Sequence, residues 1–204
     1  MWIHHIAYED SEGQLRALYD RVKGPDDNVD NIMLAHSLRP HTMEGHMALY
    51  KATLHHAHNA IAPWFLEALG VCTSLLNGCT YCVEHHFIGM KQQLEDDPRA
   101  NAIRKVLESE DLALAFSDKE IAALEYAQQL TREPSTLTQE AVNSLHNKGW
   151  SDAEVLEINQ VVAYFNYANR TVLGLGVHTD GDVLGLSPNA TEDPQDWSHR
   201  PVRG

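Results

Sequence analysis

The chain has 204 residues, 43% of them hydrophobic and 22% charged, a composition typical of a globular protein and unlike that of fibrous or intrinsically disordered chains. With 29 acidic and 15 basic side chains its formal net charge is −14, which disfavours binding to phosphate backbones and to anionic membranes. We therefore expect neither a nucleic-acid nor a membrane partner, and, without a readable leader sequence or a membrane-spanning apolar run, a cytoplasmic location.

The hydrophobic pattern is helical along most of the chain. Apolar residues recur at helical spacing and no segment alternates like a half-buried strand, so the sequence predicts an all-α fold. Helices are expected to begin after Pro40 and at Pro63, because proline fits the first helical turn, and the chain is expected to break near Pro98. We predict one domain over residues 1–176, including an N-terminal extension at 1–30.

Two capping motifs mark helix starts in the C-terminal half. The sequences SDKE at 117–120 and SDAE at 151–154 both fit the capping box, and each precedes an apolar stripe. A short helix is expected between them, at about 138–148. Gly149 and Gly174 are expected to end the two neighbouring helices, since glycine is the usual residue just past a helix C-terminus.

The last part of the chain, residues 177–204, is polar and rich in turn-forming residues. Such a composition indicates an irregular tail, lying over the protein surface or over a partner subunit. Further upstream, three histidines in the segment LHHAHN (54–59) are expected on a helix surface, because no acidic or cysteine partner is spaced to complete a metal site with them.

A pair of cysteines, Cys79 and Cys82, lies within the sequence NGCTYCVEHHF. The Asn77-Gly78 step interrupts the helix that starts at Pro63 and can cap a new helix beginning at Cys79. Both sulfurs then lie in the first helical turn, where unpaired backbone N–H groups and the helix dipole stabilise a thiolate. This placement favours redox chemistry.

Two further side chains complete a candidate proton relay. On a helix Cys79, Cys82 and His86 fall within a wedge of roughly 60°, so His86 is positioned to exchange a proton with Cys82. His85 points away from this wedge and is expected on the surface or in a second layer. If the chain folds back at Asn77-Gly78, Glu67 meets His86 and holds the imidazole in one tautomer.

A structural zinc site is the main alternative interpretation of these residues. Structural zinc needs four ligands, and the sequence has no second Cys-x-x-Cys motif. Cys79, Cys82 and His86 with an upstream histidine would supply the four, but we predict no bound metal. Cys72 is expected to be a small buried apolar residue, with a resolving role in a disulfide as the alternative.

Polar residues also interrupt the helix predicted after residue 151. Asn166, Asn169 and Arg170 lie in YFNYANR, a stretch that is otherwise half buried, and buried polar groups need partners. They are candidates to line a pocket or an oligomer interface. Hydrogen bonds to helix ends and loop carbonyls are the alternative.

The ordered set Glu67, Cys79, Cys82 and His86 resembles the core motif of the alkylhydroperoxidase D-like proteins of the carboxymuconolactone decarboxylase superfamily. The sequence from 118 to 177, together with SLRP near residue 37, is similar to the branch called peroxidase-related enzymes. This resemblance covers most of residues 30–178. It implies an all-α fold with the Cys-x-x-Cys motif at the N-terminus of a central helix, and helical units that assemble into homo-oligomers.

The resemblance also implies an activity and a role for each residue. The expected activity is that of a thiol peroxidase, in which Cys82 attacks the peroxide and becomes a sulfenic acid, and Cys79 resolves it as a disulfide. His86 and Glu67 would form the proton relay. No metal, haem or flavin cofactor is implied, and an external dithiol, either a lipoyl group or a thioredoxin-like protein, would reduce the disulfide.

The sequence departs from the family pattern at one position. Alkylhydroperoxidase D has a histidine immediately before the second cysteine, where this chain has Tyr81, a much weaker base near neutral pH. Tyr81 is expected either to donate a hydrogen bond at the pocket or to pack. Three alternative functions are a disulfide reductase, a carboxymuconolactone decarboxylase-type enzyme, which does not use a Cys-x-x-Cys pair, and a redox-sensing or zinc-stabilised scaffold.

Overall fold

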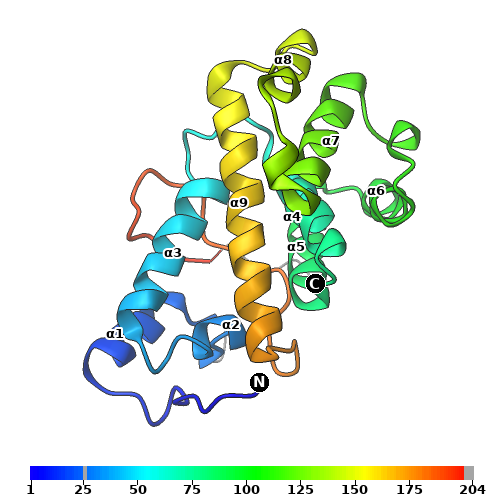
Figure 1. The fold of residues 1–204 in the computed structure, drawn as a ribbon. Helices are drawn as coiled ribbons and strands as arrows, with labels where there is room; N and C mark the ends of the chain where they lie inside the picture. Colours follow the sequence, from blue (N-terminus) through cyan, green and yellow to red (C-terminus); the bar gives the residue numbers. More distant parts are fainter. Residues whose placement is uncertain (25–26, 200–204) are drawn as a thin grey trace.

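The computed structural model describes residues 1–24 and 27–199, and within these residues it contains helices and two isolated β-bridges but no β-strand. The α-helices are α1 (Gly13–Val22), α2 (Asn31–Leu34), α3 (Pro40–Leu54), α4 (Pro63–Leu76), α5 (Thr80–Leu94), α6 (Asp97–Ser109), α7 (Asp118–Arg132), α8 (Gln139–Asn147) and α9 (Asp152–Leu175), and two short 3₁₀ helices lie at Leu112–Leu114 and Pro134–Thr136. Figure 1 shows α9 crossing the molecule, with α3 on one side and α4 and α5 on the other. The predicted all-α class is confirmed.

Helix α4 forms the centre of the core. Every residue from Phe65 to Ser74 is buried, and the helix packs against α5, α7 and α9. A helix that is apolar on all sides is stable only when neighbours cover all of it. Gly70 allows α9 to approach closely, because a Cβ atom there would lie 2.1 Å from the ring of Phe165. The burial of α4 carries Glu67 into the interior with the apolar residues.

Most of the predicted helix boundaries are confirmed, and one is corrected. Pro40 and Pro63 begin α3 and α4, and both capping boxes, at Ser117 and Ser151, are present. Helix α9, however, continues through Gly174 to Leu175, and Gly176 is the C-cap at φ +60. The left-handed backbone of a C-cap is what favours glycine, and the chain adopts it two residues later than predicted.

Helix α1 lies in the segment predicted to be only an N-terminal extension. It buries Leu15, Leu18, Tyr19 and Val22, and the Tyr19 hydroxyl donates a hydrogen bond to the backbone oxygen of Ile6. The helix starts at Gly13 after the N-cap Glu12, which makes no side-chain capping bond, so the usual start signal is missing from the sequence. Its role becomes visible only from its packing against α3.

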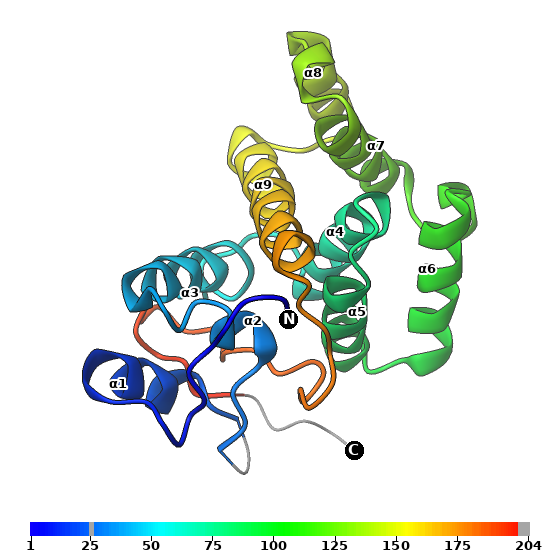
Figure 2. The same ribbon diagram turned by 60° about the horizontal axis from the view of Figure 1, so that its bottom comes forward.

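The C-terminal tail turns back from the end of α9 and crosses the side of the molecule formed by α1, α2, α3 and α5 (Figure 2). Its described part, residues 177–199, is irregular but has buried side chains, among them Leu186, Ser187 and Trp197. A bridge pairs His56 with Thr191. The predicted tail also includes residues 200–204, which lie outside the described residues.

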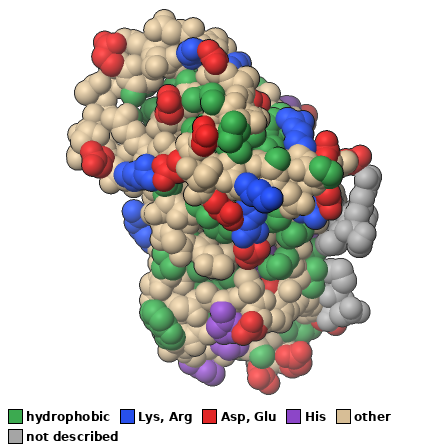
Figure 3. Space-filling view, turned by 90° about the vertical axis from the view of Figure 1, so that its right-hand side faces the viewer, with side chains coloured by type: hydrophobic (Ala, Val, Ile, Leu, Met, Phe, Trp, Pro, Cys, Tyr) green, Lys and Arg blue, Asp and Glu red, His purple; other side chains and the backbone are tan. Residues whose placement is uncertain are grey.

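The surface carries mixed charges on the face that includes α6 and α7. Figure 3 shows acidic and basic side chains interspersed over this face. Arg104 of α6 pairs with Glu84 of α5 through two bonds of 2.6 and 3.0 Å, and Arg132 of α7 pairs with Glu110 at 2.7 Å. Within the described chain, none of the helices is both long enough and apolar enough to cross a bilayer.

Candidate redox site

The turn between α4 and α5 positions the cysteine pair. Gly78 adopts φ +69, and the backbone N–H of Cys79 then donates to the oxygen of Ser74 at 2.9 Å. Cys79 is the N-cap of α5 and Cys82 lies in its first turn, so the helix begins one residue later than predicted. Both side chains are buried, and neither forms a disulfide in this structure.

The two thiols share a hydrogen bond, and the lower pKa belongs to Cys79. Its pKa is lowered chiefly because its sulfur accepts a hydrogen bond from the Cys82 thiol, and further because the Cys82 backbone N–H and the Asn169 amide donate to it. The Cys82 pKa is raised well above its ordinary value because that thiol is the donor to Cys79 and is deeply buried. Hydrogen-bond donors thus converge on the sulfur at the N-cap position and favour the thiolate form of Cys79.

Glu67 and His86 form the predicted carboxylate–imidazole contact. His86 Nδ1 donates to Glu67 Oε2 at 2.7 Å, across the α4–α5 interface. The other oxygen of Glu67 lies 3.9 Å from Nε2 of His55, a buried residue that the sequence had placed on a helix surface. Glu67 is thus held between two imidazoles. Gly89 leaves room for it, since a Cβ atom there would lie 3.0 Å from Glu67 Oε1.

A small cavity of about 50 Å³ brings Cys82 and His86 together. Aromatic residues from four parts of the chain form much of its wall: Tyr50, Tyr81, Tyr164 and Trp197. Asp30 and Glu67 also line it, and no lysine or arginine is among the described residues that do. Cys79 is fully buried outside this lining, so Cys82 is the thiol that faces the cavity.

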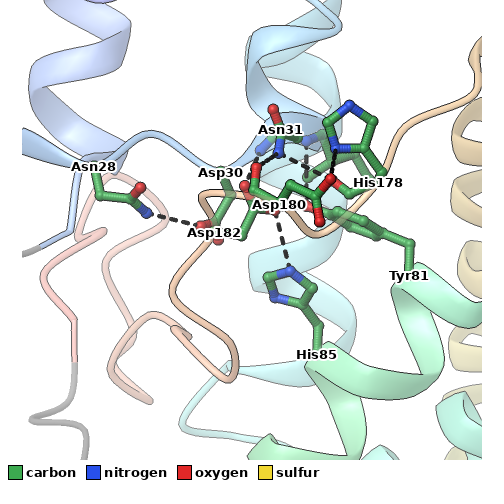
Figure 4. Close-up of polar contacts among 9 residues, drawn as sticks. Asn28, Asp30, Asn31, Tyr81, His85, His178, Asp180 and Asp182 are labelled. Atoms are coloured by element: carbon green, nitrogen blue, oxygen red, sulfur yellow. Dashed lines mark hydrogen bonds and ion pairs between the residues drawn. The ribbon is translucent and has the colours of Figure 1, made fainter. Parts of the chain in front are cut away.

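A second polar network attaches the tail to the same helix, as Figure 4 shows. The Tyr81 hydroxyl donates to Asp182 Oδ2 at 2.7 Å, and His85 Nε2 lies 3.2 Å from the same oxygen. Asp182 Oδ1 accepts the backbone N–H of Asn31 at 2.9 Å. His85 is buried and lines the cavity itself, so the expectation that it lies on the surface or in a second layer is wrong, and Tyr81 is a hydrogen-bond donor as well as part of the cavity wall.

Asp30 lies next to this network, and the pKa of its carboxyl group is raised. Its pKa is raised from 3.8 to about 6, chiefly by burial, with His85 acting to lower it and the charge of Asp182 acting to raise it. Asn28 donates a hydrogen bond of 3.1 Å to its Oδ1. Two carboxylates, Asp30 and Asp182, are thus gathered beside the helix that carries the cysteine pair.

The polar residues of YFNYANR have separate roles. Asn169 is fully buried, donates to Ser74 Oγ at 3.0 Å and bonds both cysteine sulfurs. Asn166 accepts hydrogen bonds from Asn77 of the α4–α5 turn and from Arg170. Neither Asn166 nor Arg170 lines the cavity. Asn166 and Asn169 accept hydrogen bonds from Asn77 and so attach α9 to the turn that presents the cysteines, while Arg170 bonds Asn166 within α9.

The sequence did not identify several residues around the cavity. Tyr50, Tyr164, His46, Asp30, Asp182 and Trp197 all lie in or beside its wall. His46 is fully buried and uncharged at neutral pH, because burial lowers its pKa to about 3. Isolated aromatic and acidic residues carry no motif, so no local signal marked them. Within the described residues, no group of three or more histidine, cysteine, aspartate or glutamate side chains is placed to hold a metal ion.

Similarity to known proteins is structural. No family model matches the sequence, and no curated protein matches it. The fold is similar to that of a peroxidase-related protein with an alkylhydroperoxidase AhpD core from Ralstonia eutropha JMP134, with a TM-score of 0.71 and 19% identity over 87% of this chain and 94% of that one. A peroxidase-related protein from Silicibacter sp. TM1040 has a TM-score of 0.66 and 21% identity over 76% and 80% of the two chains.

A third similar structure has a different activity in its name. The debrominase Bmp8 has a TM-score of 0.69 and 20% identity over 85% of this chain and 89% of that one. A cysteine-to-alanine variant of Bmp8 has also been solved in complex with 2,3,4-tribromopyrrole. At these identities the likeness concerns the fold, and the chain therefore has the fold of the alkylhydroperoxidase D core.

Proposed function

We propose that the protein is a thiol-dependent peroxidase in which Cys82 and Cys79 are oxidised to a disulfide. The observation that carries the proposal is the shared cavity: the Cys82 thiol faces the same space as His86, which Glu67 holds by a 2.7 Å hydrogen bond. A hydroperoxide in this space would meet a sulfur nucleophile and a proton donor together.

The reaction proceeds in two steps. After the Cys82 proton moves to His86, the Cys82 sulfur attacks the distal oxygen of the hydroperoxide and the O–O bond breaks. The alkoxide leaves with that proton from His86, and Cys82 becomes a sulfenic acid. The Cys79 sulfur then attacks the Cys82 sulfur, the S–O bond breaks, and the hydroxide leaves as water with the proton that the Cys79 thiol gives up. Two thiols and one hydroperoxide thus give one disulfide, one alcohol and one water.

The structure supports a division of labour between the sulfurs. Cys82 faces the cavity, whereas Cys79 is fully enclosed and has the lower pKa. Access therefore favours Cys82 as the sulfur that meets substrate, and charge favours Cys79 as the thiolate that resolves it. His86 has Nδ1 committed to Glu67, which leaves Nε2 to carry the proton. An external dithiol returns the pair to the reduced state.

The test follows both thiols directly. The reduced protein is mixed with one equivalent of hydrogen peroxide, free thiols are counted, and the disulfide is located by mass spectrometry. We expect rapid loss of two thiols with a Cys79–Cys82 bond, and no such loss in Cys82→Ser. Cys79→Ser should instead accumulate a sulfenic acid that a dimedone probe traps. Survival of both thiols in the wild type would refute the proposal.

A second candidate is reductive removal of halogen from an aromatic ring, and the aromatic wall of the cavity favours it. The rings of Tyr50 and Tyr164 stack at 5.5 Å beside Cys82, a surface suited to a flat ring. The electron count is the same, since two thiols and an aryl bromide give a disulfide, the arene and hydrogen bromide. Release of bromide from tribromopyrrole, with loss of two thiols and no reaction with peroxide, would select this candidate.

A further inference from the structure

The tail supplies one wall of the Cys82 cavity. Residues Gly185 to Pro188, Trp197 and His199 line it together with side chains of α3, α4, α5 and α9. Trp197 is only 3% exposed, and its ring centroid lies 5.9 Å from that of Tyr50. Its indole N–H has no hydrogen-bond partner among the described residues. A buried donor without a partner is costly, so a substrate oxygen would be a favourable neighbour for it.

Several contacts from different helices hold this wall in place. Asp182 bonds Tyr81 and His85 of α5. Lys51 of α3, which is fully buried, donates to the backbone oxygen of Asn189 and to Thr191 Oγ1. His199 Nε2 donates to the oxygen of Val22 at 2.9 Å. The wall is thus anchored on both sides of Trp197, and its position follows from the fold.

The tail also packs closely against its neighbours between these anchors. A Cβ atom at Gly185 would lie 2.4 Å from Ile88 of α5, and one at Gly24 would lie 2.5 Å from Leu186. Real Cβ atoms do not approach other heavy atoms so closely, so the backbone at these two glycines is tightly packed against the neighbouring side chains. These close contacts hold the wall in position and so set the size of the cavity.

Size and charge then limit what reaches Cys82. A cavity of about 50 Å³ has room for only a few water molecules. Its lining contains the carboxyl groups of Asp30 and Glu67 and the imidazoles of four histidines, but no lysine or arginine among the described residues to pair with an anion. A negatively charged substrate would lose its hydration and meet like charges there.

We propose that the tail makes the Cys82 pocket a size and charge filter, with Trp197 as the specificity-determining residue, and that the filter admits small uncharged peroxides, hydrogen peroxide foremost. This inference rests on the proposed peroxidase function and names its substrate class. Bulky hydroperoxides and anionic ones, such as those of fatty acids, are excluded.

The first experiment measures access without relying on peroxidase activity. Alkylation of Cys82 is followed by peptide mass spectrometry with iodoacetamide, its anionic counterpart iodoacetate, and the bulky neutral N-phenylmaleimide, each rate being divided by that for free glutathione. In the wild type we expect iodoacetamide to exceed both others by at least tenfold. Trp197→Ala should raise the normalised N-phenylmaleimide rate at least tenfold, whereas Trp197→Phe, which keeps a ring, should raise it less than threefold.

The second experiment compares hydrogen peroxide with cumene hydroperoxide as oxidants of the same proteins. The wild type should favour hydrogen peroxide, and Trp197→Ala should reduce that preference at least tenfold. If peroxides oxidise neither protein while the alkylation ratio still shifts, the filter stands and the peroxidase proposal fails. An unchanged ratio in both experiments overturns the filter.

A second variant covers the case in which Trp197→Ala does not fold. Asp182→Asn weakens the attachment of the tail to Tyr81 and His85 without changing a side chain that lines the cavity. We expect the normalised N-phenylmaleimide rate to rise at least threefold and the iodoacetamide rate to change less than twofold. Equal changes for both reagents, or none, would contradict a wall that filters by size.

Discussion

Helix α5 carries two polar networks that differ in how the chain assembles them. On one side His86 bonds Glu67, a residue 19 positions earlier on the adjoining helix. On the other side Tyr81 and His85 bond Asp182, which lies 101 and 97 positions later in the tail. The first network follows from a single turn between two packed helices. The second requires the whole chain to be folded, because the tail returns only after α9.

This difference separates the two networks in function as well. The Glu67–His86 pair faces the thiol chemistry, whereas Asp182 fixes the wall that encloses it. Loss of the Glu67–His86 pair should slow thiol oxidation with little effect on the fold. Loss of the Asp182 network should lower the free energy of unfolding and change how easily reagents reach Cys82. Variants in each network should therefore differ in whether they affect the reaction rate or the stability.

The largest effect is expected from Glu67→Gln. An amide cannot stabilise a protonated His86 as a carboxylate does, so disulfide formation with hydrogen peroxide should slow by about 100-fold, the lower end of what general acid–base catalysis contributes. Stopped-flow measurement of thiol loss checks this. Glu84→Gln, on α5 and paired with Arg104, is the matched control and should change the rate less than twofold. Equal rates for wild type and Glu67→Gln would remove the relay from the mechanism.

The next effect is on stability, from Asp182→Asn. The amide loses the charge that strengthens its bonds with Tyr81, His85 and the Asn31 N–H, and buried groups are left poorly paired, at a cost of about 2 kcal/mol. Urea denaturation measures this cost. Asp180→Asn is the control, because its exposed side chain pairs only loosely with His178 at 3.7 Å. A similar loss of unfolding free energy in both variants would show that Asp182 does not anchor the tail.

A pH experiment tests the carboxyl groups gathered beside the tail. The pKa of Asp30 is about 6 in the folded protein against 3.8 normally, so between these pH values the folded state binds more protons than the unfolded one. Its contribution to the free energy of unfolding therefore falls as pH rises from about 4 to 6. Asp30→Asn, which cannot ionise, should gain stability relative to the wild type over this range. A constant difference between the two in urea denaturation at pH 4 to 7 would contradict the raised pKa.

The smallest effect on stability is expected from a change in a helix cap. Ser151→Ala removes the capping hydrogen bond to the Glu154 backbone N–H and should cost about 1 kcal/mol of unfolding free energy. Because the cap lies far from the tail, this loss should add to that of Asp182→Asn in the double variant. A clear departure from additivity, measured by urea denaturation, would show that helix α9 and the tail are coupled.

The sequence predicted the helical body well because its signals are local. Prolines in first turns, two capping boxes and helical periodicity act over a few residues, and each is present where it was expected. The contact of Glu67 with His86 could also be predicted, because it depends only on the turn between the adjacent helices α4 and α5. Errors arose where signals were weak: α1 has no side-chain cap, and Gly174 stands two residues from the true C-cap.

From the sequence alone follow the helical class, the starts of α3, α4, α7 and α9, and the spacing that allows Glu67 to meet His86 if the chain folds back at Gly78. The packed structure was needed to show which sulfur has the lower pKa, which aromatic residues form the cavity wall, and that Trp197 of the tail lines the Cys82 cavity. Helix formation depends on neighbours within a turn, whereas burial, hydrogen bonding and charge at a site depend on every segment that the fold brings there.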